Sequence, residues 1–396
     1  MSDAGADRRR LGEWLVPLQE AALSAITPDR AVWRRMLEGR DNEDWAAQVS
    51  ARLGEDDTVR EARRARLAAL EAGRLTALDA PWVLDFVQEK LDAVAAAAQA
   101  LGAPPPRRPP LVATTMGGSV NGWAIDPGVA GHTLILIPVG LCMFCNLAAK
   151  AIARVAPRRE TGPGRFAFDF APPALRRSLG QDRTPALRFA ELVRAYLLEG
   201  RPEAARRSLP DASHIPLHNT LLRSMEIFLV AHEYGHVAAG HLDLPPNPPP
   251  DPHRCEHEAD IAGFAATAAV LRSENTDPVN ALVGAHLFLR SAGIVARCLA
   301  LLGGEDPATA GGDTPTHPAA ARRIAVLAGL ADRIIGEGPA KGAREACGRY
   351  DIILDDFAAT AEAQMTALHK AGCAPHAIWR PAGRAPQQGA WPALAL

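Results

Sequence analysis

The fold and the chemistry of this chain are predicted by the stretch Met225-Glu-Ile-Phe-Leu-Val-Ala-His232-Glu233-Tyr-Gly-His236-Val-Ala-Ala-Gly-His241. On a helix, two histidines four residues apart lie about 40° apart around the axis, so both imidazoles can reach one metal ion. Glu233 follows the first histidine, where a carboxylate can take a proton from a water held at the metal. We therefore predict His232 and His236 as zinc ligands and Glu233 as the catalytic base. His241 would lie about 140° from the ligand face and is not expected to bind the metal.

A catalytic zinc site needs a third protein ligand, and the following predicted helix offers one in Glu256-His257-Glu258-Ala259-Asp260. A proline-rich loop before it is long enough to fold this helix back against the first. Glu256 and Asp260 share a helix face, so one carboxylate can bind zinc while the other accepts a hydrogen bond from a ligand histidine. We assign Glu256 as the third ligand and Asp260 as that acceptor. Glu258 points about 200° away from Glu256 and is the weaker candidate, and His257 is expected to face solvent.

The combination of His-Glu-x-x-His with Glu-x-x-Ala-Asp resembles the gluzincin metallopeptidases, and among them the branch of the CAAX prenyl protease and the heat-shock membrane protease HtpX. Three further features agree: the extra histidine His241, the strand and turn over 134–141, and the segment Thr316-His317-Pro318 with Arg323 beyond it. The resemblance covers roughly residues 130–330 and implies a zincin-like catalytic domain. The segment His-Glu-Tyr-Gly-His is also similar to soluble bacterial peptidases of the phage-exclusion type, which act on intracellular proteins.

The resemblance also implies roles in the reaction for three parts of the chain. Strand 133–138 would offer its edge to an extended peptide through main-chain hydrogen bonds. His317 would lie near the zinc and donate to the carbonyl oxygen as negative charge grows there, with Arg323 as its electrostatic support. The alternative for this segment is a helix cap followed by a solvated pair of arginines.

The residue patterns predict an α+β fold that is mostly α-helical, with a small antiparallel sheet and an active-site helix. We expect a helical N-terminal domain over 1–103, a proline-rich linker over 104–110, a zincin-like metallopeptidase domain over 111–372 and a disordered tail over 373–396. Strands are expected at 111–115, 120–125 and 133–138, with a turn at Gly117-Gly118 between the first two. Asp79 should cap a helix that runs to Leu101, and further helices are expected at 140–155, 184–199, 219–241, 254–272, 277–302, 318–336 and 350–371. Residues 159–173 are expected to form a loop.

Composition excludes several classes of protein. The formal net charge of −2 and the absence of a basic domain give no reason to expect a nucleic-acid partner. The longest apolar run, over 133–149, is interrupted by Pro138 and Gly140, so no integral membrane segment is expected. The N-terminus lacks the apolar stretch of a secretory signal, and we expect a cytoplasmic protein. Cys142, Cys145 and Cys255 are interpreted as packing residues, with a metal or regulatory role as the alternative.

These patterns lead to the hypothesis of a zinc-dependent metalloendopeptidase that hydrolyses peptide bonds of intracellular proteins or peptides with a metal-activated water. The main alternative is a catalytically idle zinc-binding scaffold, or a regulatory protein that acts through protein partners. A regulator coupled to DNA binding is a weaker third interpretation. Glu233 favours the enzyme, because a purely structural metal site needs no base beside its ligands.

Overall fold

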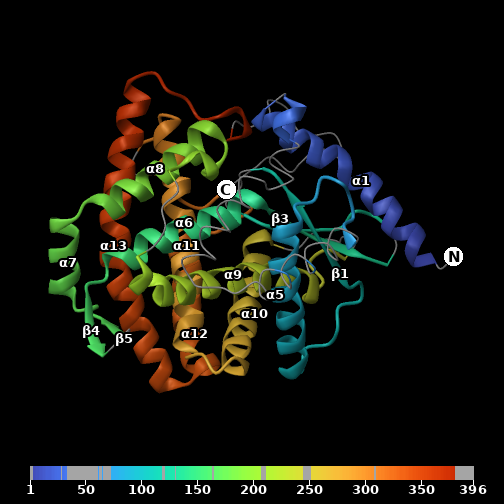
Figure 1. The fold of residues 1–396 in the computed structure, drawn as a ribbon. Coiled ribbons are helices and arrows are strands. Elements are labelled where there is room, and N and C mark those ends of the chain that lie inside the picture. Colours follow the sequence, from blue (N-terminus) through green and yellow to red (C-terminus); the bar gives the residue numbers. More distant parts are fainter. Residues whose placement is uncertain are drawn as a thin grey trace.

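Helices make up most of the structure, which is a computed structural model (Figure 1). It describes residues 3–27, 29–33, 61, 65, 73–117, 121–129, 131–162, 165–206, 211–243, 251–306 and 309–379. The helices are α1 (Asp3–Ile26), α5 (Pro81–Ala100), α6 (Val139–Val155), α7 (Pro172–Gln181), α8 (Thr184–Glu199), α9 (Ile215–Ala238), α10 (Pro252–Ser273), α11 (Val279–Leu302), α12 (Ala320–Ile335) and α13 (Glu337–Lys370). Short 3-10 turns lie at Pro202–Ala204, Ala212–His214 and Ala377–Trp379. The prediction of a mostly helical α+β fold is confirmed.

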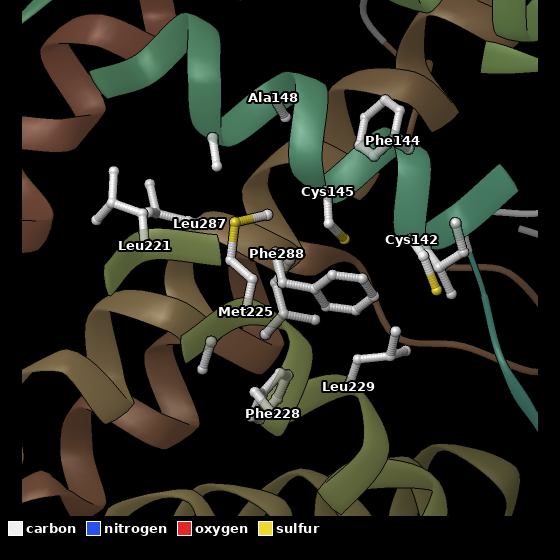
Figure 2. Close-up of a cluster of buried hydrophobic side chains, with 14 of the residues drawn as sticks. Cys142, Phe144, Cys145, Ala148, Leu221, Met225, Phe228, Leu229, Leu287 and Phe288 are labelled. Carbon is white, nitrogen blue, oxygen red and sulfur yellow. The ribbon is translucent and has the colours of Figure 1, made fainter. Parts of the chain in front are cut away.

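Helix α9, which carries the histidines, lies at the centre of the helical part and packs against α5, α6, α10 and α11 (Figure 1). The five residues 227–231 are all apolar and all buried, so the helix is hydrophobic around its whole circumference. Figure 2 shows one side of this packing, with side chains from three helices in contact around Met225. The labelled side chains are Cys142, Phe144, Cys145 and Ala148 of α6, Leu221, Met225, Phe228 and Leu229 of α9, and Leu287 and Phe288 of α11. Helix α9 is therefore held inside the core.

The three-stranded sheet differs from the predicted antiparallel arrangement. Strand β3 (Thr133–Pro138) lies between β1 (Pro110–Thr115) and β2 (Trp123–Ile125). It pairs parallel with β1 and antiparallel with β2. The predicted hairpin between the first two strands is therefore wrong, and the sheet is mixed. Every residue of β3 is buried, as expected for a central strand with a continuous apolar sequence. The expectation that 133–138 forms an exposed edge is also wrong, since both of its edges are paired.

A second small sheet occupies part of the segment predicted as loop. Strands β4 (Arg158–Gly162) and β5 (Arg165–Phe168) pair antiparallel, with an irregularity between Glu160 and Gly162. Strand β4 has the sequence Arg-Arg-Glu-Thr-Gly and is largely exposed. A strand so short and so polar lacks the apolar alternation by which strands are predicted.

The predicted helix boundaries agree well except for α13, but helix α7 (Pro172–Gln181) was not predicted, and its first two residues lie in the predicted loop 159–173. Helix α13 begins at Glu337 rather than near residue 350, because the glycines and the proline of its first turns are tolerated there. Residues 373–379, placed in the disordered tail by the sequence, pack against α8 instead: the Trp379 indole is buried and donates to the Tyr196 carbonyl over 2.9 Å. The remainder of that predicted tail lies outside the described residues, as does most of the proline-rich loop before α10.

Helix α5 joins the N-terminal part of the chain to helices α9 and α10. It begins at Pro81, as predicted, and packs against α9 and α10. Asp79 does not cap it, because the helix has no side-chain cap. Instead the buried Asp79 carboxylate accepts hydrogen bonds from the backbone N–H groups of Thr76 and Thr114 and from the Gln19 side chain of α1. The carboxylate thus ties α1 to the start of α5 and to β1.

Among the described residues, one helix, α11, is long and apolar enough to cross a membrane by length and composition alone. In its most apolar window, 67% of the residues are buried inside the fold. A buried core helix of a globular protein passes the same test. The predicted absence of a membrane segment stays a prediction.

Candidate metal centre

Two glycines bring the backbones of α9 and α10 into contact. A Cβ atom at Gly235 would lie 3.0 Å from the Ala259 carbonyl oxygen, and one at Gly263 would lie 3.0 Å from the His232 backbone nitrogen. Larger residues at either position would push the helices apart. This close approach places the histidines of α9 opposite the carboxylates of α10.

The three predicted ligands converge. The Nε2 atoms of His232 and His236 lie 3.3 Å apart. The Glu256 carboxylate faces both, with Oε2 at 3.5 Å from His232 Nε2 and Oε1 at 3.3 Å from His236 Nε2. One donor atom from each residue lies within 4.8 Å of the other two. Two imidazoles and one carboxylate are a donor set of catalytic zinc sites, so the residues present fit this metal.

Asp260 takes the predicted position behind His232. Its Oδ1 lies 3.0 Å from His232 Nδ1, which fixes the orientation of the ring. Arg323 binds Asp260 through two contacts of 2.7 Å, and its Nη1 lies 3.3 Å from Glu256 Oε2. Burial alone would raise the pKa of Asp260, but the Arg323 guanidinium and the His232 ring hold it at about 2. Asp260 therefore stays a carboxylate next to the ligand.

The charge of the cluster also favours a divalent cation. The carboxylates of Glu233, Glu256 and Asp260 all act on the buried guanidinium of Arg323. Their combined negative charge exceeds its single positive charge when all three are ionised. Oε2 of Glu256 is buried and makes no hydrogen bond, and its ion-pair neighbour Arg323, at 3.3 Å, is shared with Asp260. A buried excess charge of this kind is costly unless a cation compensates it, and the ligand atoms are where one would bind.

His241 and Glu258 support the second ligand, a role that the sequence did not predict for them. The Nδ1 atoms of His236 and His241 lie 3.0 Å apart, and His241 Nε2 lies 3.0 Å from Glu258 Oε2. The predicted angle of about 140° for His241 assumed that the helix continues to this residue, but α9 ends at Ala238. Gly240 has φ of +73°, and the His241 N–H donates to the His236 carbonyl. The glycine before His241 was the signal for this reversal.

Glu233 is buried, and Gly122, the residue before β2, lies close to its carboxylate. A Cβ atom at Gly122 would lie 3.1 Å from Glu233 Oε1, so a larger residue there would press on the carboxylate. Burial raises the pKa of Glu233 above its ordinary value, against the lowering effect of His232 and His236. A carboxylate with a raised pKa is a better proton acceptor near neutral pH. Sequence reasoning did not identify Gly122, because its partner is distant in the chain.

His317 reaches the same site from the loop before α12. Its Nε2 lies 3.6 Å from Glu256 Oε1 and 3.3 Å from the side-chain nitrogen of Asn121, a neighbour that the sequence did not predict. Thr316 Oγ1 lies 2.8 Å from His317 Nδ1. The Asn121 amide nitrogen can only donate, so that contact needs Nε2 as the acceptor; in the other tautomer the Thr316 hydroxyl donates to Nδ1 and the imidazole proton is on Nε2, facing the ligands. Burial lowers the pKa of His317, so the ring is neutral at pH 7 and can act as a hydrogen-bond donor.

Among the cysteines, Cys255 directly precedes Glu256 on α10, and Cys142 and Cys145 lie on α6. All six are free thiols. Cys142 and Cys145 lie in the core between α6 and α9, where burial raises their pKa (Figure 2). Burial likewise raises the pKa of the half-buried Cys255. Protonated, inaccessible thiols fit the predicted packing role for the first two.

Comparison with known proteins gives one finding. The family model of peptidase U49 matches residues 200–333. Comparison with curated proteins and with solved structures finds no match. The matched segment runs from before α9 into α12 and contains all the residues of the centre except Asn121 and Gly122. The resemblance to the CAAX protease branch stays a prediction, whereas the match supports a peptidase family, and hence a hydrolase, for the segment that carries the site.

Proposed function

We propose that this chain is a zinc-dependent metalloendopeptidase in which His232, His236 and Glu256 hold the metal and Glu233 is the general base. The observation that carries the proposal is the position of Glu233, a buried carboxylate with a raised pKa directly beside three converging ligands. The family match over the same residues supports peptide-bond hydrolysis in particular.

Each residue of the centre has a separate task in this mechanism. Zinc, when bound, polarises the scissile carbonyl and makes water a stronger nucleophile. Glu233 takes the proton of the attacking water and passes it to the leaving amine. His317 donates from Nε2 to the carbonyl oxygen as charge develops there, which stabilises the transition state more than the bound substrate. Asp260 and Arg323 keep His232 and Glu256 oriented.

We propose intracellular proteins or peptides as the substrates of this enzyme and the cytoplasm as its location.

Metal analysis combined with digestion of casein tests the proposal. We expect about one zinc per chain, by the three-ligand stoichiometry, and casein cleavage that a chelator stops and added zinc restores. One zinc per chain without hydrolysis of casein or of a mixed peptide library would favour the idle scaffold. Purified protein that binds no divalent metal would exclude both readings.

A further inference from the structure

A cavity of about 780 Å³ lies directly beside the metal centre. Asn121, His317 and Arg323 form part of its wall, and His317 also lies 3.6 Å from the ligand Glu256. Its volume falls in the range of about 300–1,000 Å³ that is typical of ligand pockets. A molecule held at the metal can therefore extend into this space.

One face of α11 forms another part of the wall. Leu289, Ala292, Gly293, Ala296 and Leu299 recur at spacings of three and four residues and line the cavity together. Three of these five side chains are a methyl group or smaller, which leaves room in front of Ala292 and Ala296, whereas a Cβ atom at Gly293 would lie 3.0 Å from the Ala320 Cβ on α12. The wall is apolar along its length.

The charged groups around the cavity are already paired or lie at its rim. Arg323 is bound by Asp260 and Glu256, and Asp313 pairs with Arg322 and accepts from the Ala319 N–H. Glu305 is exposed. A charged group that entered would lose water without gaining an unpaired buried charge, whereas an apolar group would gain by burial.

We infer that this cavity binds consecutive apolar side chains of the substrate, on one side of the scissile bond. This inference rests on the proposed function and adds the substrate class: peptide segments with two or more bulky aliphatic or aromatic residues next to the cleaved bond. The volume exceeds what one side chain fills, which favours a run of apolar residues over a single anchor.

The test compares the cleavage of two matched peptides by the wild type and by a variant whose cavity is filled by a larger side chain. One peptide has a pair of leucines on each side of a single cleavable bond, and the other has a pair of alanines on each side. We expect wild-type kcat/KM to be at least about tenfold higher for the leucine peptide, as for pockets that select apolar side chains. Ala296→Phe should reduce this ratio by about tenfold or more. Ala96→Phe, an exposed position on α5, is the matched control and should leave the ratio unchanged.

Ala292→Leu places a side chain smaller than phenylalanine in the same cavity. It replaces Ala296→Phe in the assay if that variant does not fold. Equal cleavage of both peptides by the wild type, or an unchanged ratio in a folded cavity variant, would overturn the inference while the peptidase activity stands. If neither peptide is cleaved, the proposed function fails. The inference about the cavity is then tested separately by measuring the binding of the two peptides. Labelled leucine peptide should then bind Glu233→Gln protein more tightly than alanine peptide, and Ala296→Phe should abolish the difference; equal binding would reject it.

Discussion

Two aspartates, Asp79 and Asp260, are both fully buried, yet their surroundings differ in kind. Asp260 lies against the guanidinium of Arg323 and the ring of His232, which hold its pKa at about 2 in spite of burial. Asp79 accepts hydrogen bonds from neutral donors only, and burial raises its pKa above the ordinary value. The same side chain at the same burial therefore helps to build a charged centre in one place and ties three elements together in the other.

The comparison teaches that burial of a carboxylate does not by itself indicate a functional site. What distinguishes the candidate metal centre is compensation: buried negative charges lie beside one guanidinium and two imidazoles. Such a cluster is expensive to assemble and adds little to stability compared with an apolar core. Changes at the metal centre should therefore alter activity and metal binding, whereas changes at Asp79 should alter stability alone.

The largest effect is expected at Glu233, where chemistry can be separated from folding. Glu233→Gln keeps the size of the side chain but removes the proton acceptor, so kcat should fall by about 10²–10⁴-fold. Zinc content and the unfolding temperature should stay close to those of the wild type. The measurement is peptide cleavage alongside metal analysis, with the exposed Glu160→Gln of β4 as control. Undiminished turnover by Glu233→Gln would remove the proposed base.

His317 should give the next largest effect. Replacing it by alanine removes the donor to the developing negative charge, so kcat should fall by about 10²–10³-fold with zinc content unchanged. Saturating substrate is used, so that a loss of binding is not mistaken for a loss of catalysis. A decrease in kcat of less than about threefold would be much smaller than the loss of an oxyanion donor causes. His317 would then be a loop or cap residue.

Smaller effects are expected behind the ligands, where Asp260→Asn should weaken zinc affinity by about 10–100-fold in a chelator competition assay. The amide no longer carries the charge that Arg323 pairs with, so His232 loses its fixed orientation. Glu256→Ala should lose zinc under mild chelation, because it removes a ligand. Glu258→Ala should keep nearly one zinc per chain, since Glu258 acts on His236 only through His241. Metal loss with Glu258→Ala but not with Glu256→Ala would reverse the ligand assignment.

Local sequence was sufficient to predict the centre where spacing on a helix determines geometry. His232 and His236 on α9 and Glu256 and Asp260 on α10 come together as predicted. Residues four positions apart lie on the same face of a helix, however that helix packs against its neighbours. The main errors have a different origin. The position of β3 between β1 and β2 depends on pairing between distant segments, and no local pattern reports it.

Close approach between distant residues could not be predicted either. Gly122 and Asn121 reach the centre only because β2 lies beside α9, and their sequence resembles an ordinary turn. The roles of His241 and Glu258 depend on a single residue of positive φ, Gly240. A glycine at a helix end is a readable signal for chain reversal, and here it redirects a histidine onto a ligand.

The smallest effect is expected for a substitution of Asp79, and it tests the difference between Asp79 and Asp260 most directly. Its Oδ1 accepts from the Thr114 N–H over 2.8 Å and its Oδ2 from the Thr76 N–H over 3.0 Å. In Asp79→Asn the amide nitrogen must face one of these donors, so unfolding should cost about 1–3 kcal/mol less than in the wild type. Activity per folded molecule and zinc affinity should be unchanged. Asp92→Asn, at an exposed position on α5, is the matched control.

The pH dependence of that loss gives a second check on Asp79. Because burial raises its pKa above 3.8, the folded state holds the proton more tightly than the unfolded chain does. The resulting stabilisation is fully present below about pH 4 and is lost as the pH rises through the folded-state pKa. Asp79→Asn does not titrate at this position. The difference in free energy of unfolding between the wild type and this variant should therefore be largest in acid and should decrease toward neutral pH. Denaturant unfolding in excess chelator, between pH 4 and 7, measures the difference without a contribution from metal release. A deficit that widens with pH would mean that Asp79, like Asp260, is held as a carboxylate by its partners.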